Sequence, residues 1–433
     1  MLARPLLQSN ENPSKFLKFV VERALANEPI TQNIIGCELF PHKYLNKDIA
    51  DVRVTAKNLR NVLAKYYESE GREDLVTIDL PAPSPDTKIK LPAGKAYTPV
   101  FTYNPRCPAH QEYSRGLLML SQLRLGEAER HFAKTIELQP RYAEPYLALA
   151  TTYLLFPICG TWRHSTFHHV REPEGFAAWI LVIRMLVAHA LTLNRKWWRT
   201  HVIRGVVHSY QRRWKKARKA FDTALLLSQE RTREDPWYIA YLAATGKTDE
   251  ASAILRAKVK DDPNNVAVLT QYGLLMYAMR QFYDANDAFC RAGNIDPHYG
   301  PVLICQMLLL LEKEMEADDA ALSVIDIVRG RMSGGLYFTG VFAFCLARRG
   351  KTREARGHLH LLLVEDMAPF QLALAHLGLG EIDEALLRLK FAGFQYNPLL
   401  LWIHLWPVFD PLRNHPQFQL LMRRMKLPAS NYI

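Results

Sequence analysis

Small apolar residues recur along most of the chain with a period of about 34 residues. Five alanines lie 34, 34, 35 and 35 residues apart: Ala217, Ala251, Ala285, Ala320 and Ala355. A period of this length is typical of helical hairpins that stack one on the next, because each hairpin can bury its apolar face only against its neighbours. Such stacks usually recognise partners, so the pattern disfavours most enzyme classes.

The alanines belong to a larger frame of small, aromatic and proline positions. One unit contains Gly273, Ala285, Phe289, Ala292 and Pro297, and the frame returns in Gly205, Ala217, Phe221 and Ala224 and in Gly116, Ala128, Phe132 and Pro140. The small residues let the two helices approach, and we expect the aromatic ring to fill the gap to the next hairpin. Proline ends the second helix. Turn signals precede second helices at Gly246-Lys247, Gly350-Lys351 and Gly380-Glu381.

These spacings resemble the tetratricopeptide repeat family from about residue 109 to residue 397. The longer interval between Ala128 and Ala217 predicts a hairpin of Ala143–Leu155 and Phe176–Leu193 with a loop inserted at Phe156–Gly175. About eight hairpins result, and the one around Ala320 departs most from the frame. Residues 398–433 carry several large aromatic residues, so we expect them to cap the open end of the stack.

The period is missing from residues 1–105, where a different unit is expected. Helical spacing predicts helices at Ser14–Ala26, Thr31–Phe40 and Asp51–Tyr67. The third helix should bury one apolar stripe, formed by Val52, Ala56, Leu59, Leu63 and Tyr66. A strand at Leu75–Leu80 follows, with a second strand at either Lys88–Leu91 or Thr98–Tyr103. Three helices followed by a β-hairpin are the order of a winged helix.

The opposite face of the third helix is basic and amide-rich, as insertion into a DNA major groove requires. Its candidate DNA-binding residues are Arg53, Lys57, Arg60, Asn61 and Lys65. Arginine and lysine can bind guanine edges or phosphates, and asparagine can pair with adenine. Lys88, Lys90 and Lys95 lie in the predicted wing and could reach the flanking backbone.

This segment also resembles the N-terminal domain of bacterial proteins that join a winged helix to tetratricopeptide repeats. The matching stretches are Phe16–Glu22, Ile35–Phe40, Val52–Val54, Leu59-Arg60, Tyr66–Glu68 and Ile78–Pro81, with Phe409–Arg413 near the C-terminus. Members are often described as transcriptional regulators. The fold class expected is therefore mainly α: a tetratricopeptide-repeat solenoid (residues 106–397) after a small α+β winged-helix-like domain (residues 1–105), with a C-terminal capping segment (residues 398–433).

Charge is spread unevenly over the chain, whose formal net charge is +12. Residues 106–232 contain 20 Lys/Arg against 9 Asp/Glu, whereas residues 1–105 contain 14 against 12. Within the early repeats, Arg195–Lys219 carries ten basic residues and no acidic one; we call this segment the basic run. It is either a solvated helix face or an electrostatic surface for nucleic acid or an acidic partner.

Enzyme motifs for nucleotide binding, nucleophilic hydrolysis and zinc proteolysis are absent from the sequence, so we expect a non-enzymatic protein without a cofactor. His164, His168 and His169 are close together, but no Cys or carboxylate completes a metal-binding set, so no metal is expected. Six scattered cysteines without a C-x-x-C pair suit a reducing compartment. With neither a signal sequence nor a membrane span expected, we predict a cytoplasmic protein that does not bind membranes.

The groove formed by the first helices of the repeats is expected to bind a protein or peptide. Its candidate lining residues are Tyr113, Leu117, Leu274, Tyr277, Tyr337 and Phe344. This apolar and aromatic lining favours a hydrophobic peptide or helix, unless the side chains instead pack against neighbouring repeats. Two functions follow from the sequence: a regulator that binds double-stranded DNA and a protein partner, or an interaction scaffold that does not bind DNA.

Overall fold

The computed structural model describes residues 1–41, 50–81, 97–122, 124–159, 175–296, 339–364, 369–394 and 398–427. The chain divides into two compact units, one of residues 1–115 with 134–140 and the other of residues 116–133 with 141–433. The predicted boundary at residue 105 differs from this division, because the first part of helix α6 (Pro108–Ser121) belongs to the first unit.

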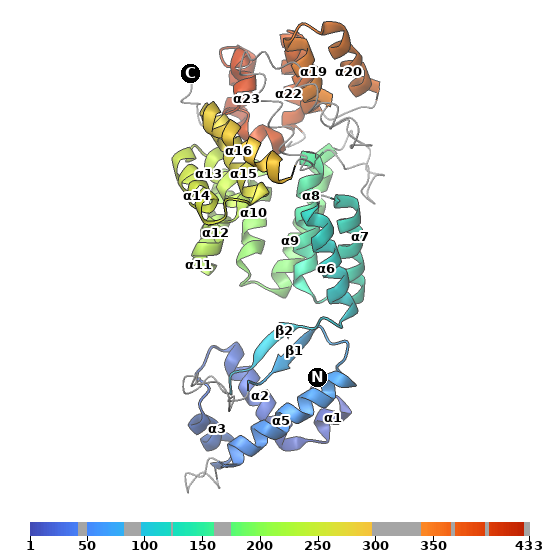
Figure 1. Ribbon diagram of the computed structural model, residues 1–433, viewed down its shortest axis with the longest axis vertical. Coiled ribbons are helices and arrows are strands. Elements are labelled where there is room, and N and C mark those ends of the chain that lie inside the picture. The colour runs from blue at the N-terminus through green and yellow to red at the C-terminus, as the bar shows by residue number, and fades with distance from the viewer. Residues whose placement is uncertain are drawn as a thin grey trace. The chain divides into compact units, whose positions relative to one another are not determined.

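The first unit consists of short helices and an antiparallel pair of strands (Figure 1). Before α6 its described elements are α1 (Pro5–Gln8), α2 (Glu11–Leu25), α3 (Gln32–Leu39), α5 (Ala50–Glu68), β1 (Val76–Asp79) and β2 (Val100–Tyr103). The Thr31 hydroxyl accepts a hydrogen bond from the Ile34 amide and so caps the start of α3. The strand register runs from Val76 opposite Tyr103 to Asp79 opposite Val100. The second strand therefore lies at the later of the two predicted positions.

The apolar stripe of α5 forms the centre of the first core, as predicted. Val52, Ala56, Leu59, Leu63 and Tyr66 are all buried, and they share one cluster with apolar residues of α2. Repeated apolar positions at steps of four and three put one face of a helix inside, so the sequence pattern was sufficient here. The order of helices and strands agrees with the predicted order of a winged helix, whereas the winged-helix assignment itself stays a prediction.

The described residues from α6 to α22 form seven antiparallel helical hairpins (Figure 1). Their helices are α6 with α7 (Leu125–Leu138), α8 (Ala143–Cys159) with α9 (Gly175–Leu193), α10 (Trp198–Tyr210) with α11 (Trp214–Leu227), α13 (Pro236–Ala244) with α14 (Thr248–Asp261), α15 (Val266–Ala278) with α16 (Phe282–Ile295), α19 (Thr339–Arg348) with α20 (Thr352–Val364), and α21 (Pro369–Gly378) with α22 (Ile382–Phe394). A short helix α12 (Gln229–Arg233) lies between α11 and α13. The predicted hairpin around Ala320 lies outside the described residues.

Each repeat glycine is placed against the repeat phenylalanine of its own hairpin. A Cβ added to Gly273 would lie 2.4 Å from the Phe289 ring, and the same holds for Gly205 with Phe221 at 2.7 Å. The prediction that this ring fills the gap to the next hairpin is therefore only part of its role. Phe221 does also contact the next hairpin, since its ring centre lies 4.3 Å from that of Tyr241.

The turn between the two helices of a hairpin needs a left-handed residue. Gly246, Gly350 and Gly380 have φ angles of 83°, 77° and 76°, so the glycine turn signals are confirmed. At the equivalent position of the α10/α11 and α15/α16 hairpins the chain instead has Arg212 and Arg280, with φ angles of 56° and 61°. A non-glycine residue is sterically disfavoured in this conformation. Arg280 has stabilising side-chain contacts at its turn, because it donates to the Leu405 carbonyl at 3.1 Å and pairs with Asp410 at 2.7 Å.

The insertion is shorter than predicted at its N-terminal side. Helix α8 continues to Cys159, beyond the expected end at Leu155, so the prediction of a loop from residue 156 is wrong for residues 156–159. Residues 160–174 lie outside the described part of the chain.

The C-terminal segment, formed by η5 (Pro398–Trp402), η6 (Pro407–Leu412) and α23 (Pro416–Met425), lies against the middle of the stack as well as its end. At the end, the rings of Phe370 and Phe409 pack at 5.9 Å. In the middle, η5 contacts α8, α10 and α13, and the Trp402 indole donates to the Ala240 carbonyl at 3.0 Å. The prediction of a simple end cap is therefore corrected: the segment runs back along the first helices of three hairpins.

Candidate functional site

The polar face of α5 is open to solvent in the first unit. Arg53, Lys57, Asn61 and Lys65 are exposed, on the side opposite the buried stripe. A helix face of this kind can present cations and an amide to an anionic surface, and the binding of DNA by these residues stays a prediction. Lys88, Lys90 and Lys95, the predicted wing lysines, lie outside the described residues.

Arg60 has a structural role that the sequence did not indicate. Its Nε donates to the Leu80 carbonyl at 2.7 Å, and one Nη donates to the Pro81 carbonyl at 2.8 Å. Burial lowers the pKa of the Arg60 guanidinium, which is the direction expected for a charge moved away from water. Two donors of Arg60 are thus engaged by the chain just after β1, and the contact of Arg60 with DNA stays a prediction.

The predicted peptide groove is partly closed. Tyr277 and Phe344 are only 2% and 7% exposed, so the prediction that they line an open groove is corrected. Leu274 and Tyr113 are half-buried and Leu117 is 42% exposed, and their role in binding stays a prediction. Tyr337 lies outside the described residues.

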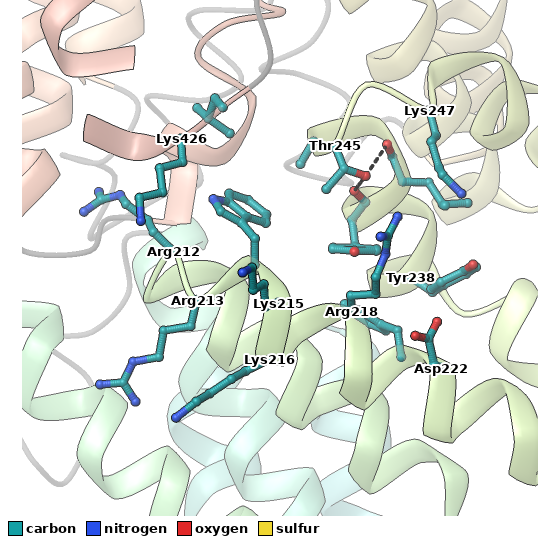
Figure 2. Close-up of a pocket in the computed structure, with 16 residues that line it drawn as sticks. Arg212, Arg213, Lys215, Lys216, Arg218, Asp222, Tyr238, Thr245, Lys247 and Lys426 are labelled. Carbon is teal, nitrogen blue, oxygen red and sulfur yellow. Dashed lines mark hydrogen bonds between the residues drawn. The ribbon is translucent and has the colours of Figure 1, made fainter. Parts of the chain in front are cut away.

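A cleft with a volume of about 840 Å³ opens beside the basic run, within the second unit (Figure 2). We call it the basic cleft. It lies between the α10/α11 hairpin and the next hairpin, α13/α14, and the end of α23 completes it. Its cationic lining residues are Arg212, Arg213, Lys215, Lys216, Arg218, Lys247 and Lys426, and Asp222 is the acidic residue among the lining side chains.

Aromatic side chains form the floor of the basic cleft. Trp214, Phe221, Tyr238 and Tyr241 border it, and the ring centre of Phe221 lies 5.5 Å from that of Tyr238. The Trp214 indole donates to the Met425 carbonyl at 3.0 Å, and this bond attaches α11 to the end of α23. The floor is therefore fixed by packing between repeats and by the C-terminal segment.

Several cations at the basic cleft have no acidic partner. Within the described part of the chain, Arg213, Lys215 and Lys216 form no ion pair, whereas Lys247 pairs with Glu250 at 3.3 Å. Arg218 lies close enough to Tyr241 to oppose the rise that burial causes in the pKa of the Tyr241 hydroxyl. Unpaired cations that gather along the edge of a cleft create a positive potential, which attracts anionic ligands.

The pKa of His208, on α10, is lowered partly by this positive potential. Its pKa is lowered to about 4, first by burial and then by nearby cations on three helices: Arg204, Arg213, Lys216 and Arg184. A neutral imidazole at this position is the expected response, because a further positive charge would be both desolvated and repelled. The cations of α9, α10 and α11 thus act on one region.

The pKa of His208 can be tested by NMR titration of its ring protons. We expect a midpoint near pH 4, and an upward shift when Lys216→Gln removes one cation. Since the unfolded value is 6.5, the unfolded chain binds this proton first, and the stability of the fold should fall as pH drops from 6.5 toward 4. His404, whose pKa is also lowered to about 4 by burial and Arg413, is the internal control and should not respond to Lys216→Gln. A titration midpoint near pH 6.5 for His208 would contradict the effect of burial and of the neighbouring cations on its pKa.

Only part of the basic cleft was visible in the sequence. The sequence indicates the basic run. The aromatic floor of the cleft, however, combines residues from α11 and α13, and Lys426 comes from the far end of the chain. The 34-residue period offered one usable signal, because it places Tyr238 and Tyr241 in the first helix of the hairpin that follows the hairpin of Phe221.

Within the described ranges, no cluster of three or more His, Cys, Asp or Glu side chains could hold a metal ion. No helix in those ranges is both long and apolar enough to cross a membrane.

No protein-family model and no curated protein matches the chain. Solved structures match at low identity. The human IFIT1 dimer with PPP-AAAA is 13% identical, over 97% of this chain and 89% of that chain, with a TM-score of 0.48. Yeast Tom70 is 15% identical, over 96% and 83%, with a TM-score of 0.41. YrrB, a TPR protein with an unusual peptide-binding site, is 18% identical, over 46% and 91%, with a TM-score of 0.26. All three TM-scores lie below 0.5, so these likenesses carry no argument about what this chain does. The helical hairpins, their period of about 34 residues and their Gly–Phe packing agree with the tetratricopeptide arrangement expected from the sequence.

Proposed function

We propose that this protein is a non-enzymatic cytoplasmic regulator that binds double-stranded DNA through α5 and a protein or peptide partner through its hairpin repeats. The observation that carries the DNA part is the exposed face of α5 with Arg53, Lys57, Asn61 and Lys65. Among the described residues it lies on the third of the three helices that are eight residues or longer before the strands, and it precedes an antiparallel strand pair. Winged helices place their recognition helix in this order.

The charges of residues 1–105 determine the expected strength of DNA binding. Most non-specific affinity for DNA comes from phosphate neutralisation, and residues 1–105 carry only a small positive excess. Binding by α5 should therefore be modest on random duplexes and stronger on a preferred sequence, where Arg53 or Asn61 can contact base edges.

The test is fluorescence anisotropy of the full chain with labelled genomic duplex fragments at two salt concentrations. The variant Arg53→Ala/Lys57→Ala should weaken binding by about tenfold or more and reduce the slope of log K against log salt by about 1.8. Lys15→Ala/Lys18→Ala is the matched control, since both lysines are exposed on α2 and each faces a glutamate one turn away. Equal losses in both variants would contradict a role for α5, and absence of duplex binding would favour the scaffold without DNA.

A further inference from the structure

We propose that the basic cleft binds a single strand of nucleic acid, with phosphates on its cations and an unpaired base against its aromatic floor. This site is separate from α5, and the proposal does not depend on duplex binding there.

The cations stand on both sides of the cleft. Figure 2 shows Arg212, Arg213 and Lys216 gathered on one side and Arg218 with Lys247 on the other. A phosphodiester strand that crosses the cleft would meet positive charge as it enters and as it leaves. The continuation of the basic run onto exposed Arg204 of α10 extends the same surface beyond the cleft.

The floor and the size favour unpaired bases over other anions. Base–aromatic stacking needs a ring at the bottom of a charged groove, and Tyr241 and Trp214, both half-buried, border the cleft. A volume of about 840 Å³ lies in the range of sites for nucleotide-sized ligands. Duplex DNA keeps its bases stacked inside the helix and cannot place one here, while an acidic peptide would use the cations without using the rings.

The experiment measures binding of fluorescein-labelled oligo(dT) and oligo(U) to the full chain by anisotropy, over a range of salt concentrations. Lys215→Gln/Lys216→Gln should weaken binding at least tenfold and reduce the salt slope by about 1.4, because glutamine keeps the helix and removes two charges. Arg353→Gln/Lys390→Gln, with exposed cations on α20 and α22, removes the same charge away from the cleft and should change little. The two oligonucleotides show whether the strand is DNA, RNA or either.

Two further variants separate the ligand site from the fold. Tyr241→Ala should weaken binding by about tenfold, whereas Tyr241→Phe, which keeps the ring, should retain most of it.

The outcomes are distinct. Loss of oligonucleotide binding in the cleft variants, with retention in Arg53→Ala/Lys57→Ala, supports the proposal whether or not α5 binds duplex DNA. Equal losses in the cleft and control variants would mean unspecific charge attraction and would overturn it. Binding of polyglutamate that depends on Lys215 and Lys216, without oligonucleotide binding, would assign the cleft to an acidic peptide instead.

Discussion

Replacing Phe289 by alanine is expected to lower the free energy of unfolding by about 3–5 kcal/mol, through loss of buried apolar surface and the cavity that remains. The ring is 1% exposed and packs on Gly273, where even one added methyl group would overlap it. Urea unfolding followed by circular dichroism measures the loss. Hydrogen exchange of α15 and α16 locates it, because each repeat contacts only its neighbours along the stack.

The control for Phe289→Ala lies on the same helix. Tyr283 is 83% exposed, so Tyr283→Ala removes an aromatic ring of similar size from α16 and should cost less than about 0.5 kcal/mol. Gly273→Ala should itself cost about 1–3 kcal/mol by overpacking, and much less once Phe289 is already alanine. Additive losses in the double variant would show that the two residues are not coupled as the packing indicates.

The repeat was predictable because it depends on contacts close in sequence. Gly273 and Phe289 are neighbours within one hairpin, and the period repeats that pair at Gly205 and Phe221. The same holds for the buried stripe of α5 and for the capping threonine at the start of α3. In each case local spacing and side-chain size determine the geometry.

Contacts between distant segments were not predictable in this way. The bonds from Arg60 to the end of β1, and from Trp402 to Ala240, join residues with no shared periodicity. In the sequence, an arginine that binds backbone carbonyls, such as Arg60, cannot be distinguished from an exposed cation on the same helix face. The basic cleft was predictable only in part. Its charge follows from the basic run, whereas its aromatic floor depends on how two hairpins stack.

Replacing Arg413 by methionine is expected to destabilise the C-terminal segment by about 3 kcal/mol. The Arg413 side chain is 8% exposed, and it donates to the His404 carbonyl at 2.6 Å, to the Trp406 carbonyl at 3.2 Å and to Asp410 at 2.5 Å. Methionine fills much of the volume but donates nothing, so two carbonyls lose a donor and Asp410 loses its better-buried partner. Arg413→Lys should give an intermediate loss, because an ammonium group cannot reproduce the planar fork.

Hydrogen exchange provides the readout for Arg413→Met. Faster exchange is expected in residues 398–427 and in the α15/α16 turn, because Arg280 of that turn shares Asp410 with Arg413. Arg424→Met, at an exposed site on α23, is the matched control and should leave exchange unchanged. If the segment is only an end cap, the loss should stay at α21 and α22. Faster exchange at α10 and α13 would instead show that the contacts of the C-terminal segment with these first helices depend on the Arg413 guanidinium. The position of Lys426 at the basic cleft would then depend on it as well.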